Sequence, residues 1–423
     1  MQLPETLEGW LSLLEARHGQ AIQLGLDRVR RVKDALNLPQ TCPVFIVGGT
    51  NGKGSTCAML EAVLLAAGCR VGLYTSPHLV RYNERVHING RDASDEALVE
   101  AFETVERARG EVPLTYFEHG TLAAWAAFCK AGVDAVILEV GLGGRLDAVN
   151  VFEPDCAIVT SVAMDHMDFL GDTREAIGFE KAGIFRPGKP AICSDPQPPE
   201  SLVKHAEAIG ARLWVSGRDF GFAGDQTQWA FWLAGGSRRG GLAYPALRGV
   251  NQLLNAAAVM AACESVRDIL PVPMQAIRQG FMLVDLPGRF QVLPGRPTVV
   301  LDVAHNPQAA GVLAENLASM GFFPETWAVI GMLADKDVAG VIRLLRDRVD
   351  HWVACTLPGP RGLSAARLAE IIRESGAAGD IIECDSAQAA YGLAHERAAE
   401  GDRIVVFGSF LTVADVLAAR KAS

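Results

Sequence analysis

Short apolar runs alternate with amphipathic stretches along most of this chain. Near its start, apolar side chains recur at helical spacing, first within residues 10–14 and then within residues 29–36. The pattern then changes to the uninterrupted apolar run 44–47, which predicts a buried strand. Glycines follow this run, and a helical pattern begins near Ser55. Strand, glycine loop and helix in this order are expected of an α/β protein.

The same alternation continues beyond the first strand and helix. Further strand signals occur at residues 71–74, 135–138, 157–162 and 191–193. Strands separated by helical stretches predict a mostly parallel sheet. Residues 211–247 differ, because aromatic side chains stand there among glycines, and we expect antiparallel strands on the edge of the first domain. A helix is predicted over residues 255–266.

A segment with two Pro-Gly turns, residues 286–297, predicts a domain boundary. Beyond it, alternation resumes with strand signals at residues 298–303, 328–330, 352–354, 381–383 and 403–407. We therefore expect two α/β domains: a larger one, residues 1–294, and a smaller Rossmann-like domain, residues 295–423.

Composition narrows the class of protein without indicating its chemistry. The chain has 423 residues, of which 49% are hydrophobic, and its formal net charge is -10. An acidic chain is not expected to coat nucleic acid or an anionic membrane. No apolar run approaches the ~18 residues that span a bilayer, and the first residues do not resemble a secretory signal. The 9 cysteines are scattered, with no Cys-x-x-Cys pair. We expect a cytoplasmic protein.

The glycine-rich segment Gly48–Ser55, with the sequence GGTNGKGS, joins a predicted strand to a predicted helix. Glycines let backbone N–H groups turn toward an anion, and the helix N-terminus adds a partial positive charge. Lys53 is placed to reach the terminal phosphates of a nucleotide. The match to the usual phosphate loop is loose, because Gly54 separates the lysine from Ser55. The alternative is a flexible turn with an incidental lysine, but the flanking strand and helix favour nucleotide binding.

Polar side chains follow three other predicted strands. Glu139 ends an apolar strand and precedes a glycine run, a position that suits a magnesium ligand. His166 follows another strand, although magnesium prefers oxygen ligands and a histidine alone indicates little. Ser76 is placed to complete a metal site, but Ser-Pro is more often a turn. The composition around Lys181 indicates only a lysine on a helix surface.

Taken together, these segments identify the sequence as similar to a known family. It resembles the bacterial bifunctional dihydrofolate synthase/folylpolyglutamate synthases of the Mur ligase superfamily. The similar segments run in order through nearly the whole chain: GGTNGKGS (48–55), YTSPHLVRYNERV (74–86), LTYFEHGT (114–121), ILEVGLGGRLDAVN (137–150), DHMDFLG (165–171), EKAGIFRPGKPAI (180–192), LPGRFQ (286–291), LDVAHNP (301–307) and GMLADKD (331–337).

The resemblance implies an ATP-dependent amide ligation in folate biosynthesis. ATP would phosphorylate a substrate carboxylate to an acyl phosphate, and the amine of L-glutamate would then displace phosphate. Dihydropteroate and tetrahydrofolate are the expected acceptors. The implied cofactors are two magnesium ions and a monovalent cation, with ATP as co-substrate. The chain is expected to act as a monomer on small molecules, with neither nucleic acid nor membrane as partner.

The resemblance also assigns roles to individual residues. Three would act in catalysis: Lys53, His166 and Lys181, the last as a carbamate. Three match the family's magnesium ligands: Ser76, Glu139 and His166. Eight would contact ATP: Gly52, Lys53, Gly54, Ser55, Asn255, Arg289, Asp302 and His305, with Asn306 in the same segment. Because Arg289 falls in the predicted linker, ATP is expected between the domains, with closure needed for catalysis.

Pterin recognition is implied for a third set of residues. They are Ile22, Gln23, Leu24, Thr115, Tyr116, Phe117, Glu118 and Leu146. Aromatic groups suit a flat pterin-aminobenzoate. Gln23 departs from the aspartate of a relative, and its amide oxygen would accept from pterin N–H groups without charge.

Three alternatives remain at the level of sequence. The chain could be a folylpolyglutamate synthase alone, and comparing dihydropteroate with tetrahydrofolate as acceptors separates the two. A cell-wall Mur ligase is disfavoured, because the region before the phosphate loop is too short for a UDP-binding domain. A nucleotide-dependent switch or binding module would leave Glu139, His166 and Arg289 unexplained.

Overall fold

The computed structural model describes residues 3–17, 23–225 and 227–422. The chain forms two compact units. The first takes in residues up to Ala246 together with Leu253–Val284, and the second takes in Leu247–Gln252 together with the chain from Asp285 onward. None of the helices in these described ranges combines the length and apolar composition needed to cross a bilayer.

The first unit is built on an eight-stranded sheet with the strand order β4-β3-β2-β5-β1-β6-β7-β8. Its strands are β1 (Val44–Gly48), β2 (Val71–Tyr74), β3 (Val86–Ile88), β4 (Arg91–Asp92), β5 (Ala135–Glu139), β6 (Cys156–Val159), β7 (Pro190–Cys193) and β8 (Arg212–Val215). All neighbouring strands from β2 to β8 pair in parallel, while β3 and β4 form an antiparallel edge. The mostly parallel sheet predicted from the sequence is confirmed.

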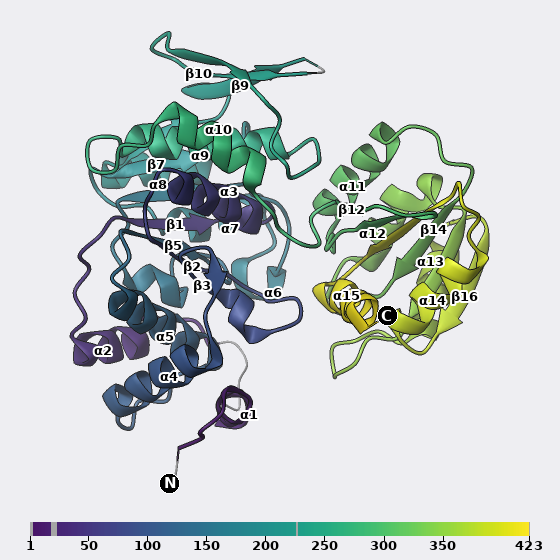
Figure 1. Cartoon of the computed structure of the whole chain (residues 1–423), viewed down its shortest axis with the longest axis horizontal. Helices are drawn as coiled ribbons and strands as arrows, with labels where there is room; N and C mark the ends of the chain where they lie inside the picture. Colours follow the sequence, from purple (N-terminus) through teal and green to yellow (C-terminus); the bar gives the residue numbers. More distant parts are fainter. Residues whose placement is uncertain (1–2, 18–22, 226, 423) are drawn as a thin grey trace. The chain divides into compact units, whose positions relative to one another are not determined.

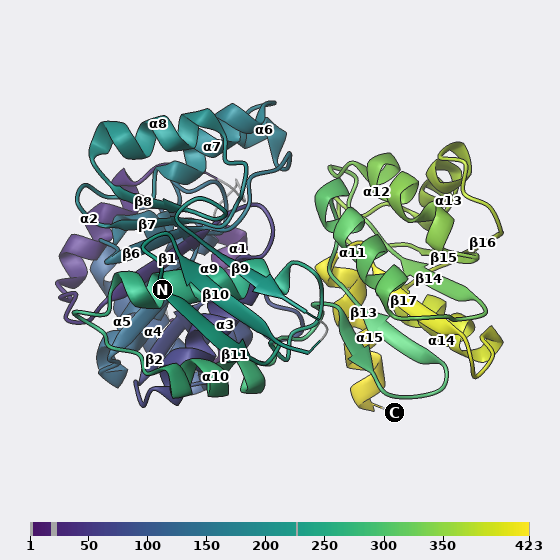
Figure 2. The same ribbon diagram turned by 90° about the horizontal axis from the view of Figure 1, so that it is seen from above.

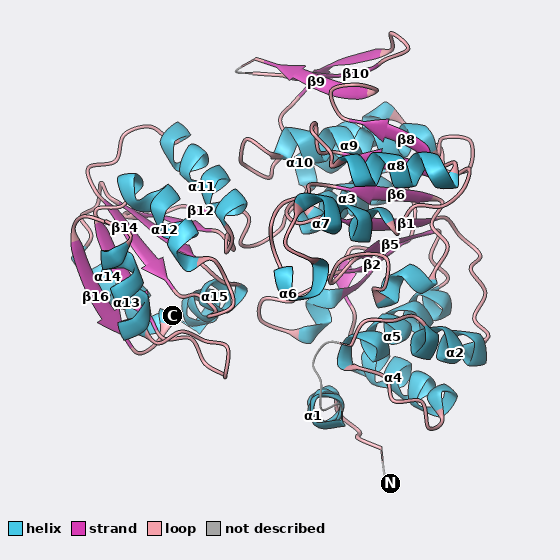
Figure 3. Ribbon diagram, turned by 180° about the vertical axis from the view of Figure 1, so that it is seen from behind, coloured by secondary structure: helices cyan, strands magenta, loops and turns pink. Residues whose placement is uncertain are grey.

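Helices cover both faces of this sheet (Figure 1, Figure 3). They are α1 (Leu7–Arg17), α2 (Asp27–Leu36), α3 (Lys53–Ala66), α4 (Asp95–Arg109), α5 (Tyr116–Ala131), α6 (Met167–Leu170), α7 (Arg174–Ala182), α8 (Glu200–Ile209), α9 (Gln252–Ser265) and α10 (Met274–Leu283), with the short 3-10 helices η1 (Tyr82–Arg85) and η2 (Ala148–Val151). Helices α3, α9 and α10 lie on one face, and α2, α4 and α5 on the other (Figure 1). Strands β1, β5 and β6 are therefore buried on both sides and need apolar side chains throughout.

The glycine- and aromatic-rich region 211–247 differs from its expected arrangement. Its first strand, β8, is parallel and extends the main sheet next to β7. Three later strands, β9 (Phe220–Gly224), β10 (Trp229–Leu233) and β11 (Arg238–Leu242), form an antiparallel sheet of their own. This sheet lies against α10, where the rings of Trp229 and Phe281 are 6.1 Å apart (Figure 1). The apolar face of the small sheet is thus buried on a helix rather than at the edge of the large sheet.

The second unit contains a six-stranded sheet with the order β12-β13-β17-β14-β15-β16. Its elements are β12 (Gln291–Leu293), β13 (Thr298–Leu301), α11 (Pro307–Ser319), β14 (Thr326–Ile330), α12 (Val338–Leu345), η3 (Arg346–Arg348), β15 (His351–Cys355), α13 (Ala365–Glu374), β16 (Asp380–Cys384), α14 (Ala387–Arg397), β17 (Arg403–Phe407) and α15 (Phe410–Ala422). Helices α11, α12 and α13 lie on one face, and α14 and α15 on the other (Figure 2).

The two units divide after Val284, ahead of the boundary expected after Pro294. The segment between these positions contains β12, which pairs antiparallel with β13 through Gln291↔Leu301 and Leu293↔Val299. Two Pro-Gly turns marked this segment as a linker in the sequence, but its backbone hydrogen bonds place it in the second sheet.

Candidate functional site

Four neighbouring strands of the large sheet bring the main candidate residues to one edge. The central order is β2-β5-β1-β6, and all four strands run in the same direction. The register pairs Tyr74 with Leu138, Val47 with Glu139, and Gly48 with Val159. The segments that follow these strands therefore leave the sheet side by side, at the edge where ligands bind in open α/β sheets.

The phosphate-loop segment is held in place by the chain that follows β6. Thr50 donates its backbone N–H to the Ser161 carbonyl at 2.7 Å and its hydroxyl to the Ala163 carbonyl at 3.1 Å. The Lys53 ammonium curls back over the loop and donates to the carbonyls of Gly49 at 3.1 Å and Thr50 at 3.2 Å. Lys53 is therefore positioned above the loop, where the terminal phosphates of a nucleotide would lie.

Gly52 joins this loop to the first turn of α3 and brings Asn255 beside it. Its backbone has φ of 90°, in the region that favours glycine, and it precedes the first helical residue, Lys53. A side chain at Gly52 would place its Cβ 2.8 Å from the Asn255 Oδ1. Asn255 projects from α9 and is buried. The structure thus brings Asn255 to the phosphate loop, although 202 residues of sequence lie between Gly52 and Asn255.

Glu139 has a fixed orientation at the end of β5. Its side chain is buried, with 3% exposed. The Thr75 hydroxyl donates to Glu139 Oε2, and the Ser76 backbone N–H donates to the same oxygen at 3.2 Å. One carboxylate oxygen is therefore held by the segment after β2. Glu139 and Ser76 are among the residues predicted from the sequence, whereas Thr75 is not, because its only signal was its place beside Ser76 at a strand end.

His166 lies in the segment after β6. It precedes α6 with φ of 52°, and its backbone N–H donates to the Asp165 carboxylate at 2.9 Å. Its imidazole Nε2 is 4.0 Å from Asp165 Oδ1. The described part of the chain gathers no three His, Cys, Asp or Glu side chains into a metal cluster. A carboxylate, a hydroxyl and an imidazole still fit a Mg²⁺ ion, since this ion usually keeps waters and phosphate oxygens among its ligands.

Lys181 has an unusual environment for a lysine. It lies in α7, where its side chain is buried, with 3% exposed. Burial lowers the pKa of Lys181 to about 7, and the neighbouring Lys53 charge lowers it further, whereas Asp165 and Asp147 oppose the shift. No carboxylate of the described residues lies within 4.0 Å of its ammonium. Close to neutral pH the amine is thus partly unprotonated and nucleophilic. Its expected place on a helix surface, drawn from composition alone, is wrong.

The glycine run after β5 is attached to α7 near Lys181. Arg145 donates its backbone N–H to the Glu180 carbonyl at 2.8 Å, and its guanidinium pairs with the Glu180 carboxylate at 2.8 Å. Asn150 donates its amide to the Gly183 carbonyl at 3.0 Å. Position 181 is therefore fixed relative to the loop that begins at Glu139.

Asp147 organises that loop from inside and is not among the residues predicted from the sequence. Its two carboxylate oxygens accept from the N–H groups of Leu142 at 2.8 Å and Val149 at 3.0 Å. Burial raises the pKa of Asp147 to about 6, although these hydrogen bonds oppose the shift. The available signal was an aspartate three residues after a pair of glycines, which indicates a turn.

The residues expected to bind pterin come together in the described part of the chain. Gly25 donates its N–H to the Leu146 carbonyl at 3.2 Å. Arg28 donates to the Gln23 carbonyl at 2.9 Å and pairs with Glu118 at 2.9 Å. The segment containing Gln23 and Leu24 thus lies beside both α5 and the glycine run. Ile22 falls outside the described residues.

The N-terminus of α5 carries the other four residues expected to bind pterin. Thr115 and Glu118 form a capping box, in which each side chain accepts from the other's backbone N–H, at 3.1 and 2.8 Å. Tyr116 and Phe117 are half-buried, and the Phe117 ring lies 5.8 Å from the Tyr74 ring. The capping box explains Thr115 and Glu118 structurally, while the two rings provide flat surfaces at the start of the helix.

The second unit groups Arg289, Asp302 and His305 near the end of β13. Asp302 accepts from the N–H groups of Phe290 and Ala304, each at 2.8 Å. Burial raises the pKa of Asp302, and the nearby charge of Arg289 opposes the shift. The Arg289 guanidinium lies over the Phe410 ring at 4.9 Å, and the His305 ring is 6.2 Å from the same ring. All three residues therefore share one end of the second sheet.

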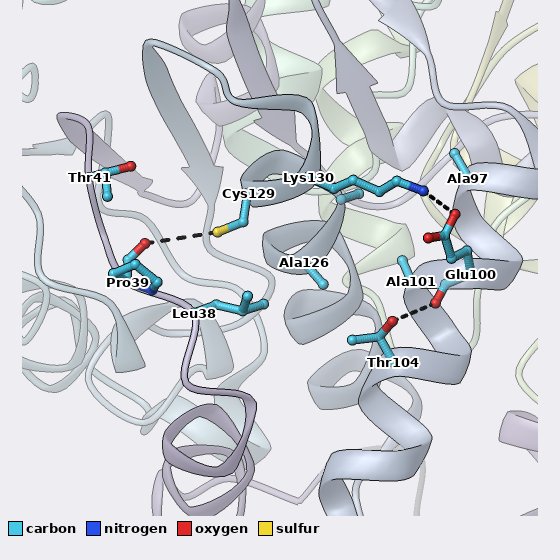
Figure 4. A pocket seen from close by; sticks show the side chains of 11 residues that line it. Leu38, Pro39, Thr41, Ala97, Glu100, Ala101, Thr104, Ala126, Cys129 and Lys130 are labelled. Carbon is cyan, nitrogen blue, oxygen red and sulfur yellow. Dashed lines mark hydrogen bonds and ion pairs between the residues drawn. The ribbon is translucent and has the colours of Figure 1, made fainter.

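A cavity of about 410 Å³ lies elsewhere in the first unit, between α4, α5 and residues 38–41 (Figure 4). It is lined mainly by small apolar side chains, and Glu100 pairs with Lys130 across its rim. None of its lining residues belongs to the predicted site. The candidate chemistry thus lies at the strand ends rather than in this cavity.

Two protein-family models match the chain. The Mur ligase middle domain matches residues 47–228, and the Mur ligase glutamate ligase domain matches residues 288–410. The dihydrofolate synthase/folylpolyglutamate synthase of Escherichia coli (strain K12) is 45% identical over 417 residues, which cover 98% of this chain and 96% of that protein.

The chain belongs to the dihydrofolate synthase/folylpolyglutamate synthase family of Mur ligases.

Solved structures of family members have the same fold. Escherichia coli FolC in complex with DHPP and ADP has a TM-score of 0.94, with 44% identity and coverage of 100% of this chain and 99% of that one. A bifunctional folylpolyglutamate synthase/dihydrofolate synthase with Mn, AMPPNP and L-glutamate bound has a TM-score of 0.91, with 44% identity and coverage of 99% and 100%. The Mur ligase fold and the family resemblance predicted from the sequence are confirmed.

The fixed Glu139 carboxylate leads to a first prediction for this family member. Thr75→Val removes the hydroxyl that orients Glu139 but keeps the shape of the threonine side chain, whereas Thr75→Ser keeps the hydroxyl. With Glu139 as a metal ligand, Thr75→Val should weaken Mn²⁺ binding about 10- to 100-fold in the presence of an ATP analogue, and Thr75→Ser should bind like wild type. Titration of free Mn²⁺ measures this directly.

A matched control is Thr104→Val, because the half-buried Thr104 donates its hydroxyl to the Glu100 carbonyl at 2.8 Å within α4, away from Glu139. It should leave Mn²⁺ affinity unchanged. Equal Mn²⁺ affinity in Thr75→Val and wild type would contradict the positioning role.

Proposed function

We propose that this chain ligates L-glutamate to dihydropteroate and extends tetrahydrofolate with further glutamates, consuming ATP through an acyl-phosphate intermediate. The observation that carries this proposal is the convergence of the phosphate loop, the fixed Glu139 carboxylate and the buried Lys181 amine around one edge of the sheet. Membership of the family supports it further.

The chemistry explains why two anionic substrates must be handled together. A free carboxylate is a poor electrophile, so one of its oxygens first attacks the γ-phosphorus of ATP, and ADP leaves. The glutamate amine then attacks the acyl carbon, loses a proton, and phosphate departs with the carboxylate oxygen. Negative charge develops at each step, and preorganised cationic groups and N–H donors stabilise it.

Three groups of the first unit would stabilise the ATP phosphates. The loop N–H groups from Gly52 to Ser55 and the N-terminus of α3 would bind the phosphates, together with Lys53, whose ammonium lies over the loop. Asn255 would contact the nucleotide from α9. Arg289, Asp302 and His305 of the second unit are the further ATP contacts that we propose.

Ser76, Glu139 and His166 would hold magnesium, which neutralises phosphate charge and polarises the transferred phosphoryl group. A relative's structure contains Mn, AMPPNP and L-glutamate, so a divalent metal together with nucleotide is expected here. We propose Mg²⁺ as that metal, with two ions and a monovalent cation per site, and a monomeric protein.

The pterin of the acceptor would lie against the N-terminus of α5. Tyr116 and Phe117 would contact its flat rings, with Thr115, Glu118 and Leu146 around them. Leu24 and the exposed Gln23 would contact the pterin from the N-terminal side. Gln23 would accept from the pterin through its amide oxygen.

The assay that tests the function measures phosphate release from ATP with magnesium. Wild-type protein given dihydropteroate and L-glutamate should release phosphate and form dihydrofolate, and tetrahydrofolate should also serve as acceptor.

The rate of Lys53→Met should be about 100-fold or more below that of wild type, because a charge that stabilises the transferring phosphoryl group is removed. Lys204→Met, an exposed control, should match wild type. If neither dihydropteroate nor tetrahydrofolate led to phosphate release, the proposed function would be contradicted. Activity with tetrahydrofolate alone would indicate a folylpolyglutamate synthase.

A third prediction concerns carbamylation of Lys181. The neutral amine attacks CO₂ and releases a proton, giving a carbamate that would orient the metal. Because the pKa of Lys181 is lowered to about 7, the amine is neutral above this pH and protonated below it. A carbamate resonance from ¹³C-bicarbonate should therefore be present at about pH 9 and lost, together with activity, as the pH falls through 7.

Lys181→Met should lack the carbamate resonance at every pH, whereas Lys204→Met should retain it. A resonance that persists in Lys181→Met, or that is absent from wild type at about pH 9, would show that Lys181 is not carbamylated.

A further inference from the structure

Arg85 occupies an unusual position at the end of η1. Its side chain is half-buried, and its guanidinium lies 5.4 Å from the centre of the Tyr82 ring and 5.6 Å from that of Tyr116. Its Nε donates to His78 Nδ1 at 2.8 Å. Since the arginine Nε–H is always a donor, this histidine nitrogen must be an unprotonated acceptor. The immediate partners of the guanidinium therefore bear no negative charge.

The missing counter-charge distinguishes Arg85 from two other half-buried arginines of the first unit, Arg17 and Arg28. Within the described ranges no carboxylate lies within 4.0 Å of its guanidinium. Arg17 and Arg28 are also half-buried, and each pairs with a glutamate, at 2.7 and 2.9 Å. A partly desolvated cation that stacks on aromatic faces and lacks an acid partner is in an environment suited to an incoming anion.

Arg85 contacts both the segment that is proposed to bind metal and the start of α5, which is proposed to bind pterin. Its backbone carbonyl accepts from the Thr75 N–H at 2.9 Å, and Thr75 holds Glu139. Tyr74 precedes Thr75 in the chain, is fully buried, and has its ring 5.8 Å from that of Phe117. Arg85 therefore lies between the segment proposed to bind metal and the aromatic start of α5.

We propose that Arg85 binds a spectator carboxylate of the substrates, that is, a carboxylate that does not react. This inference rests on the proposed function. The Nε–H of the planar guanidinium is engaged by His78, and the N–H groups of the two terminal nitrogens have the paired geometry that matches a carboxylate. Two substrates carry such a group. L-Glutamate brings its own carboxylates, and tetrahydrofolate keeps one unreacted carboxylate on its glutamate. Dihydropteroate has only the carboxylate that reacts.

Steady-state kinetics of Arg85→Gln and Arg85→Lys distinguish these two sources. If Arg85 binds the amino acid, the KM for glutamate should rise about 10- to 100-fold with either acceptor, with a smaller change in kcat. If it binds the acceptor, the KM for tetrahydrofolate should rise by that factor while the KM for dihydropteroate stays unchanged. Arg85→Lys should recover only part of the loss, because an ammonium lacks the paired N–H geometry.

Arg70→Gln is the matched control, since Arg70 is exposed and pairs with Asp134 at 2.8 Å, away from the site. It should retain wild-type KM values. Circular dichroism and thermal unfolding establish whether each variant is folded. If Arg85→Gln does not fold, the KM values of Arg85→Lys are used instead. Glutamine and 4-aminobutyrate, each lacking one carboxylate of glutamate, give a second measurement. In the amino-acid case, the variants should discriminate less than wild type against one of them.

Unchanged KM values for glutamate and for tetrahydrofolate in a folded Arg85 variant would overturn the proposal. The proposed function is tested separately by the activity of wild-type protein, so the two failures are distinguishable.

Discussion

The parallel register of β2, β5, β1 and β6 is the constraint on which the rest of the site depends. Because these strands end at the same edge, residues distant in sequence emerge next to one another there. Pairing of Val47 with Glu139 places the phosphate loop beside the strand that carries the carboxylate. Hydrogen bonds then fix each segment, from Thr50 to the chain after β6 and from Thr75 to Glu139. These hydrogen bonds restrict the conformations of the loops, and fixed loops are needed to position two anionic substrates for reaction.

Burial at this edge changes the chemistry of ordinary side chains. It lowers the pKa of Lys181 to about 7 and raises that of Asp147 to about 6, so both groups titrate close to neutral pH. The net charge of -10 does not indicate these pKa shifts, because it is a sum over all charged residues of the chain. Locally, Lys53, Arg85 and the loop N–H groups supply a positive field that the composition does not reveal.

Much of the fold follows from the sequence, because apolar runs and glycine turns act locally. The strands around the phosphate loop, the second α/β unit and the edge position of Glu139 are of this kind. Other features depend on contacts between distant segments. Burial of Lys181 arises from packing of α7 on the glycine run, and β12 acquires its place only by pairing with β13. For Thr75 and Asp147 the local pattern indicates only a strand end and a turn, because their roles depend on the hydrogen-bond partners that the fold brings to them.

The central claim, that the chain activates a substrate carboxylate as an acyl phosphate, is tested most directly with an oxygen label. Dihydropteroate labelled with ¹⁸O in its carboxylate would be converted with ATP, magnesium and L-glutamate, and the released phosphate analysed by mass spectrometry. The account predicts one ¹⁸O atom in each phosphate formed, because the carboxylate oxygen departs with the phosphoryl group. Phosphate free of label, formed together with dihydrofolate, would contradict it.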